Sequence, residues 1–271
     1  MKSNQISTTN FPKLSYTISG SETAPALILL HGFPESGTLW QKIAPSLSKD
    51  FLLVIPDLPG SGNSELGQGK TNMEQLSEGV KQILDAENIS KAVIVGHSMG
   101  GYVSLAFAEL YPSYVQGLSL VHSTAVSDTE EKKENRRKAI ALIQKGGKEA
   151  FVRGMVPNLF SDTFKKLNPK VIEAHIETGI KLKAESMIAF YEAMLVRPMR
   201  TSALKQATHP VQWIIGKYDN LIPTESALQQ CSLAQVNFVS LYAESGHMSM
   251  IECPHLLERD LKDFTLYCFN C

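Results

Sequence analysis

Short apolar runs alternate along this chain with segments in which apolar residues recur at the spacing of a helix. A run such as ALILL at 26–30 has no polar position, which is typical of a strand buried on both faces. LSYTIS at 14–19 instead alternates apolar and polar residues, as a half-exposed strand does. Strands are expected at 14–19, 26–30, 51–55, 92–95, 118–121, 211–215 and 237–241.

Helices are expected between most of these strands, because apolar residues there recur every three or four positions. The expected helices are 35–47, 73–84, 99–111, 128–147, 148–154, 169–178, 184–194, 225–230 and 254–267. Buried strands that alternate with helices predict an α/β fold, with a mostly parallel central sheet covered by helices on both faces. Strand signals are missing from residues 124–200, so a helical insertion is expected there, between core segments 1–123 and 201–271.

Composition and charge exclude several classes of partner. The chain is 43% hydrophobic and 20% charged with a net charge of −1, as in an ordinary globular protein. Such a chain offers no electrostatic reason to bind nucleic acid or an anionic membrane. The first residues lack the apolar core of a signal peptide, and no apolar run approaches membrane-spanning length. A cytoplasmic location is therefore expected.

A charged run and a cysteine pair give little indication of a binding site. The run Lys132 to Lys138 mixes both signs, which indicates a solvated helix face and not a binding patch. No cluster of Arg or Lys indicates an anionic substrate, and only Lys217 and Arg197 are left open as contacts of one. Cys268 and Cys271 form a C-x-x-C without a second ligand pair, so no metal is expected and a frayed tail with free thiols is the simpler interpretation.

The most informative stretch is Gly96-His97-Ser98-Met99-Gly100, which lies between an expected strand and an expected helix. A serine thrust out of so tight a turn must adopt strained backbone angles, and its neighbours must have almost no side chain. Gly96 and Gly100 supply that room. The first N–H groups of the following helix then point toward the hydroxyl and could stabilise an oxyanion. The alternative is a serine that merely caps the helix.

Three further residues follow expected strands directly. Phe33 comes after 26–30, Asp219 after 211–215 and His247 after 237–241. Reactive groups of parallel sheets collect at the carboxyl ends of the strands. We therefore expect these residues at the same edge of the sheet as Ser98.

These positions belong to five stretches in which the chain resembles the α/β-hydrolase superfamily. The stretches are LLHGFP at 29–34, DLPGSGNS at 57–64, VGHSMGG at 95–101, GKYDNLIP at 216–223 and GHMSMIECP at 246–254. The chain order Ser, acid, His is that of the superfamily. The resemblance covers nearly the whole chain and implies that the helical insertion is a cap over the active site.

The chain is most similar to HGFP-type, cap-bearing serine hydrolases, which include esterases, haloperoxidase-like perhydrolases and carbon–carbon bond hydrolases. Epoxide hydrolases and haloalkane dehalogenases share the HGFP segment but use an aspartate nucleophile, so Ser98 argues against both activities. The resemblance implies a serine hydrolase, most simply a carboxylesterase of small esters or lactones, without metal or organic cofactor. Perhydrolysis, carbon–carbon or amide cleavage, and a small-molecule receptor that keeps the triad are the alternatives.

The resemblance also assigns roles. Ser98 is the expected nucleophile, His247 its base and Asp219 the acid that orients the imidazole. A plain turn aspartate is the alternative for Asp219. The backbone N–H groups of Phe33 and Met99 are expected to form the oxyanion hole.

The substrate pocket is the least readable part of the sequence. A cap must face the active site, so some of its apolar residues should line the pocket and favour a substrate with an apolar group. Histidines beside the strand ends are assigned either to the pocket or to packing and hydrogen bonding. The possible pocket residues are His31, His97, His122, Phe160, Phe190 and Met194. Asp57 and Glu252 are expected to be structural, Glu252 by helping to start the last helix.

Overall fold

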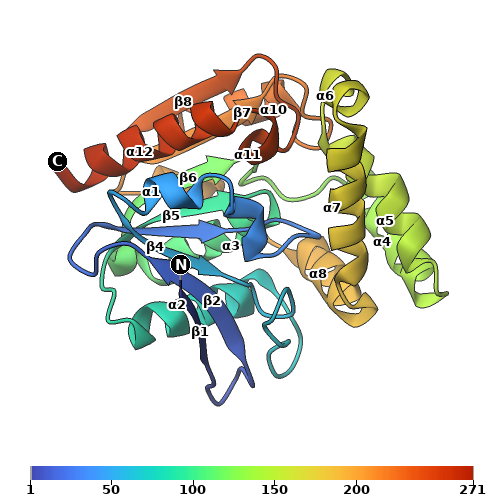
Figure 1. Ribbon diagram of the computed structural model, residues 1–271, viewed down its shortest axis with the longest axis horizontal. Coiled ribbons are helices and arrows are strands. Elements are labelled where there is room, and N and C mark those ends of the chain that lie inside the picture. The colour runs from blue at the N-terminus through green and yellow to red at the C-terminus, as the bar shows by residue number, and fades with distance from the viewer. Residues whose placement is uncertain (1, 271) are drawn as a thin grey trace.

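The computed structural model describes residues 2–270 of the chain, which form an eight-stranded sheet with helices on both sides (Figure 1). The strand order is β1-β2-β4-β3-β5-β6-β7-β8. β1 and β2 run antiparallel to their neighbours, and all other pairs are parallel. The strands are β1 (Lys2–Ile6), β2 (Leu14–Ser19), β3 (Ala26–Leu30), β4 (Leu52–Pro56), β5 (Ala92–His97), β6 (Val115–Val121), β7 (Val211–Gly216) and β8 (Asn237–Tyr242). The predicted α/β class with a mostly parallel sheet is confirmed.

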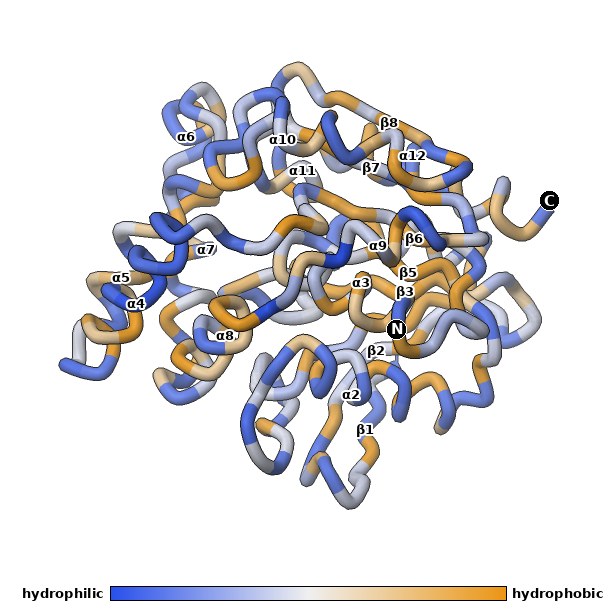
Figure 2. Tube along the Cα trace, turned by 180° about the vertical axis from the view of Figure 1, so that it is seen from behind, coloured by the Kyte–Doolittle hydropathy of each residue, from blue (hydrophilic) through white to orange (hydrophobic). Residues whose placement is uncertain are grey.

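The continuous apolar runs are the middle of the sheet. Every residue of β3, β4, β5 and β7 is buried, whereas the edge strand β1 is largely exposed. Figure 2 shows the central strands β3 and β5 in the orange of hydrophobic residues. Burial of both faces of these strands is the main driving force for this fold, because apolar area removed from water contributes about 25 cal/mol per Å².

Most helices lie where the apolar spacing predicted them. The α-helices are α1 (Ala44–Leu47), α2 (Met73–Ala86), α3 (Met99–Leu110), α4 (Glu130–Gln144), α5 (Lys148–Met155), α6 (Asp162–Leu167), α7 (Pro169–Lys181), α8 (Ala184–Val196), α9 (Thr201–Lys205), α10 (Thr224–Leu228), α11 (Ser249–Glu252) and α12 (Pro254–Asn270). Short 3-10 helices span Gly37–Trp40, Pro112–Tyr114 and Val156–Leu159. No helix of residues 2–270 is long and apolar enough to cross a bilayer.

Helices α4 to α8 follow one another between β6 and β7 and stand to one side of the sheet (Figure 1). We call them the inserted helices. Residues 124–200 contain no strand, as expected. The division of the chain into a core and a separate cap domain stays a prediction.

Three local expectations differ from the structure. The single helix expected at 35–47 is instead the 3-10 helix Gly37–Trp40 and the short α1, because Pro45 has no N–H for a continuous helix and therefore starts a new one. The edge strand β1 was not expected, since KSNQI has too few apolar residues to signal a strand. Helix α6 was also not expected, because none of its residues is buried and its sequence has no apolar stripe.

The expected frayed C-terminal tail is corrected as well. Helix α12 continues to Asn270, and Cys268 is 2% exposed. A Cβ atom at Gly117 would lie 2.4 Å from the Cys268 sulfur, so this side chain packs closely against β6. Cys271, the other half of the C-x-x-C, lies outside the described residues.

Candidate active site

Ser98 occupies the turn between β5 and α3 with φ 52° and ψ −114°. These are strained angles for a residue with a side chain, and the surrounding structure must hold them. The Ser98 N–H donates to the carbonyl oxygen of Val121 at 2.9 Å. A Cβ atom at Gly96 would lie 2.4 Å from the carbonyl oxygen of Gly100, and one at Gly100 would lie 2.6 Å from that of Leu30. The turn therefore requires glycine at both positions.

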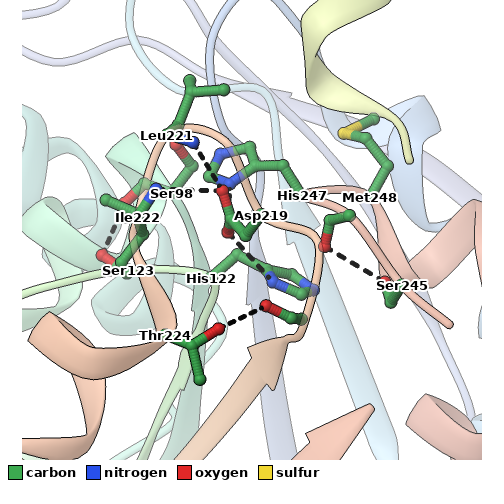
Figure 3. Close-up of polar contacts among 12 residues, drawn as sticks. Ser98, His122, Ser123, Asp219, Leu221, Ile222, Thr224, Ser245, His247 and Met248 are labelled. Carbon is green, nitrogen blue, oxygen red and sulfur yellow. Dashed lines mark hydrogen bonds and ion pairs between the residues drawn. The ribbon is translucent and has the colours of Figure 1, made fainter. Parts of the chain in front are cut away.

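His247 and Asp219 meet at the same edge of the sheet, although 28 residues separate them in the chain. His247 Nδ1 lies 2.7 Å from Asp219 Oδ2, and both side chains are 1% exposed. The backbone N–H groups of Leu221 and Ile222 donate to Asp219 Oδ1 at 2.8 and 2.9 Å. Figure 3 shows Ser98, His247 and Asp219 gathered together. The carboxylate is thus held at both oxygens.

The second nitrogen of the His247 imidazole is available for chemistry. His247 Nε2 is buried and has no hydrogen-bond partner among residues 2–270. Because Nδ1 donates its proton to Asp219, Nε2 carries the lone pair in the neutral ring. The imidazole can therefore accept a proton at Nε2 while Asp219 fixes its tautomer and orientation.

Asp219 is ionised despite its burial. Desolvation by burial raises the pKa of this carboxyl, but the neighbouring imidazoles of His247 and His122 lower it by more, so the net pKa lies well below the usual range. A carboxylate that stays charged can stabilise an imidazolium on His247 without taking its proton.

Two more histidines surround this pair. His122 Nδ1 lies 3.4 Å from Asp219 Oδ2, and His122 has a φ of 49°. His97 Nε2 lies 2.9 Å from the His247 carbonyl oxygen. Burial lowers the pKa of both His97 and His122, and for His97 the nearby His247 and His122 lower it further. These rings are therefore neutral. His97 contacts the backbone of His247 through its Nε2, and His122 packs beside Asp219.

His122, Asp219 and His247 are also close enough together to be considered as a metal site. Within residues 2–270, ligand atoms of His122, Asp219 and His247 come within 4.8 Å of one another. Asp219 Oδ2, the oxygen nearest to both rings, is already engaged by His247 at 2.7 Å. The donor set fits a hydrogen-bonded charge pair better than an open metal site, which needs free ligand atoms.

Two backbone N–H groups come from segments that meet at Ser98. Met99 is the first residue of α3, so its N–H has no acceptor within the helix. Phe33 follows Gly32, at which a Cβ atom would lie 3.1 Å from the Ser98 Cβ. His31 shapes this loop, since its Nδ1 lies 2.8 Å from the Gly32 carbonyl oxygen. The arrangement can offer two donors to a negatively charged oxygen bonded near Ser98.

Residues 25–254, well over half of the chain, match the profile of the alpha/beta hydrolase fold family. The chain belongs to this family. The predicted membership is therefore confirmed, together with the strand–turn–helix context in which the family places its Gly-x-Ser-x-Gly motif.

Several known proteins resemble this chain over most of its length. An esterase from Thermogutta terrifontis, solved with malate bound, superposes with a TM-score of 0.92 and 27% identity over 99% of each chain. The pimeloyl-[acyl-carrier protein] methyl ester esterase of Pseudoalteromonas atlantica is 27% identical over 90% of this chain and 95% of its own length. The 3-oxoadipate enol-lactonase 1 of Acinetobacter baylyi is 26% identical over 89% of this chain and 88% of its own.

Other relatives are longer than this chain. It spans 64% of the length of the first curated relative that it matches and 36% of the next ones, which is less than two thirds in each case. The chain therefore corresponds to only a part of those proteins.

A cavity of about 340 Å³ contains Ser98 and lies between the inserted helices and the sheet edge. Its apolar wall comes mainly from α5 and α8, through Phe151, Met155 and Met194. Phe33 and Tyr102 from the core, with Ala139, Tyr191, Leu221 and Ile222, also line the cavity.

Of the six possible pocket residues, Met194 lines the cavity, whereas the other five side chains are buried in contacts beside it. For those five, a place in the substrate pocket stays a prediction. Phe160 stacks on Phe164 at 5.6 Å between ring centres, and Phe190 packs edge-on against Phe33 at 6.4 Å. The five residues outside the cavity lining are His31, His97, His122, Phe160 and Phe190.

Glu252 has a role that its sequence position did not indicate. It was expected to start the last helix, but its Oε1 accepts from the N–H groups of Gly246 at 3.0 Å and Met248 at 3.2 Å. Its Oε2 accepts from Ser161 N–H in the inserted segment at 3.1 Å. Glu252 therefore holds the loop that carries His247. The five-residue spacing from His247 in GHMSMIE is the one sequence signal that could have pointed to it.

The charged face of α4 is solvated in part, as expected, but it also borders the cavity. Lys132 and Asn135 are exposed and Arg136 is half-buried, and all three line the cavity together with Asp128. Helical periodicity places these residues on one face but does not say what that face meets. By contrast, Asp57 is structural as expected, since its carboxylate accepts from the N–H groups of Gly37 and Asn63 at 2.9 and 2.8 Å.

Proposed function

We propose that this chain is a serine hydrolase of small carboxylic esters or lactones, and that Ser98, His247 and Asp219 are its catalytic triad. One observation carries the proposal: the strained Ser98 turn lies beside His247 (Figure 3), whose Nδ1 is held by a buried carboxylate and whose Nε2 has no partner within residues 2–270. A serine hydroxyl is a weak nucleophile until such a base takes its proton.

The reaction follows from these positions. His247 Nε2 takes the Ser98 proton as Oγ attacks the ester carbonyl, and the N–H groups of Phe33 and Met99 stabilise the oxyanion. His247 then gives the proton to the departing alcohol, which leaves an acyl-enzyme. Water repeats the two steps against the acyl group and releases the acid and the free Ser98 hydroxyl. Asp219 stays ionised throughout and stabilises the imidazolium.

The substrate is expected to carry an apolar group. Phe151, Met155 and Met194 supply an apolar wall, and the inserted helices act as a cap by closing the cavity over Ser98. The ester-cleaving and lactone-cleaving names of the relatives support the same class of reaction.

The test is hydrolysis of p-nitrophenyl esters by the wild type and Ser98→Ala, with acyl chains from short to long. We expect multiple turnovers in the wild type and a loss of at least about 10⁴-fold in Ser98→Ala, because the residual rate would come from binding and the oxyanion hole alone. Circular dichroism and thermal unfolding of the variant control for the fold. Undiminished turnover in Ser98→Ala would overturn the assignment.

The same triad chemistry can act on other bonds, so the assay extends to a diketone, a peptide amide and hydrogen peroxide as acyl acceptor. A clear preference for one of these would replace ester hydrolysis as the main activity. One burst of product per molecule, with a ligand-dependent rise in thermal stability, would indicate a receptor instead.

A further inference from the structure

The cavity beside Ser98 has one charged wall in addition to its apolar one. This wall is formed by Asp128, just before α4, and by Lys132, Asn135 and Arg136 on α4. Polar side chains in a mostly apolar cavity set the orientation and specificity of a ligand. The chemistry of this wall therefore bears on which ester is bound.

The wall is positively charged overall. Asp128 Oδ2 accepts from Arg136 Nε at 2.6 Å, and Asp128 Oδ1 accepts from Arg197 Nη2 at 2.8 Å. One carboxylate thus serves two arginines. Lys132 adds a third cation, which has no carboxylate within ion-pair distance among residues 2–270.

Lys132 lies at the exposed rim of the cavity, close to the two arginines. Partial desolvation and the charges of Arg136 and Arg197 lower its pKa, against the opposite effect of Asp128 and Asp219. Its Nζ donates to the Leu221 carbonyl oxygen at 3.0 Å. An added negative charge in the cavity would relieve the repulsion among the three cations.

Arg136 is oriented for an anion. Its Nε is used by Asp128, and its guanidinium carbon lies 5.1 Å from the centre of the Tyr191 ring, so both contacts fix the plane of the group. The two terminal nitrogens, Nη1 and Nη2, have no hydrogen-bond partner among residues 2–270. A fixed guanidinium with free donors is the geometry that binds a carboxylate through two hydrogen bonds.

We propose that the cavity selects esters that carry a carboxylate away from the scissile bond, and that Arg136 and Lys132 bind this carboxylate. The inference rests on the proposed function. It assumes that the ester carbonyl of the substrate is bound at Ser98 and assigns the carboxylate at the other end of that substrate to Arg136 and Lys132. Phe151, Met155 and Met194 then contact the apolar chain between the two groups.

The experiment compares two pairs of matched esters. The first pair has the variable group on the acyl side: the p-nitrophenyl monoester of glutaric acid, and its analogue with an isopropyl group in place of the carboxylate. The second pair has it on the alcohol side: 4-butyryloxybenzoate and 4-butyryloxybenzamide. The quantity measured is the ratio of kcat/KM within each pair. Each kcat/KM is taken after subtraction of the enzyme-free rate and is divided by the rate constant for hydrolysis of the same ester by hydroxide.

In the wild type we expect the carboxylate ester of one pair to be preferred by at least about tenfold, because it gains charge-assisted hydrogen bonds that the neutral ester lacks. Arg136→Met and Lys132→Met are each expected to lower that ratio by about tenfold. The control is Arg137→Met on the same helix, whose side chain is 54% exposed and pairs with Glu134. It removes the same charge and should keep the wild-type ratio.

Two outcomes overturn the inference: a wild-type ratio near one in both pairs, or a ratio that Arg136→Met and Arg137→Met lower equally. Absence of turnover on all four esters would count against the proposed function instead. In that case calorimetric titration with glutarate still decides the inference. Binding by the wild type and Arg137→Met that is lost in Arg136→Met supports it, and no binding by the wild type refutes it.

Discussion

Glu252 shows how one carboxylate can position His247, the proposed catalytic base, through the loop that carries it. The N–H groups on both sides of His247, those of Gly246 and Met248, donate to Glu252, while the His247 N–H donates to the Leu159 carbonyl oxygen at 2.8 Å. All three N–H groups of this short loop are therefore bound. Because the loop has no regular secondary structure, these bonds fix the direction of the imidazole.

Substitution of Glu252 by Gln should reduce turnover more than substrate binding. Glutamine keeps one acceptor oxygen but places an NH₂ group against N–H donors, which releases part of the loop. We expect kcat for a short ester to fall about ten- to 100-fold, as small misplacements of a catalytic group do, with little change in KM.

Steady-state kinetics measure this split, and thermal unfolding measures any loss of fold. The matched control is Glu244→Gln, which removes an exposed carboxylate from the same loop. A rise in KM at unchanged kcat would contradict a positioning role for Glu252.

The turn between β5 and α3 is the element on which the site depends. Gly96 and Gly100 let the strand and helix approach so closely that a Cβ atom at either position would overlap backbone. Backbone cannot move aside as a flexible side chain can, so the close approach is lost if a methyl group is added. This geometry explains the Gly-x-Ser-x-Gly motif. The strained turn at Ser98 can form only with glycine two residues before and two residues after the serine.

The same substitution should have opposite effects in two helices. Gly100→Ala should lower the free energy of unfolding by at least about 1–3 kcal/mol through overpacking. Gly154→Ala, in α5, should raise it by about 0.5–1 kcal/mol, since nothing lies within 4 Å of the added Cβ and alanine favours a helix. Urea unfolding of both variants measures the difference. A destabilised Gly154→Ala or a wild-type-like Gly100→Ala would show that local space does not control these positions.

At the scale of the whole molecule, folding buries several histidines in their neutral form. Burial lowers the pKa of His31, His97 and His122, and lowers that of His209 from 6.5 to about 4. The unfolded chain exposes these rings and restores a pKa near 6.5. Between pH 6.5 and 4 the unfolded state therefore binds more protons, and the stability of the folded state falls as the pH falls.

His209 allows a test away from the active site, because it precedes the amino end of β7 and its Nε2 has no partner within residues 2–270. We expect His209→Gln to reduce the slope of unfolding free energy against pH, between pH 6 and 4.5, by up to about 1.4 kcal/mol per pH unit. Urea unfolding across that range gives the slope. A change of packing alone would lower stability equally at every pH, so an unchanged slope would refute the neutral burial of His209.

Much of the fold was predictable because its signals are local. The runs at 26–30, 51–55 and 92–95 are continuous and apolar, and they form β3, β4 and β5 within one residue or two. The helix expected at 35–47 failed because a proline break outweighed its apolar spacing. The edge strand β1 failed for another reason: it is held by hydrogen bonds to β2, and its own residues are mostly polar.

The sequence by itself determined the α/β class and family membership, and it singled out Ser98, Asp219 and His247, because short motifs and apolar runs encode backbone geometry locally. Only the tertiary structure decided which segments or cavities each helix face and each of these side chains contacts. It turned Lys132 and Arg136 toward the cavity, set His122 against Asp219 and brought Glu252 to the His247 loop. Those contacts join segments that are remote in the chain or lie on opposite sides of a turn. Periodicity fixes the side of a helix on which a residue lies, but the neighbour of that side depends on the packing of the whole molecule.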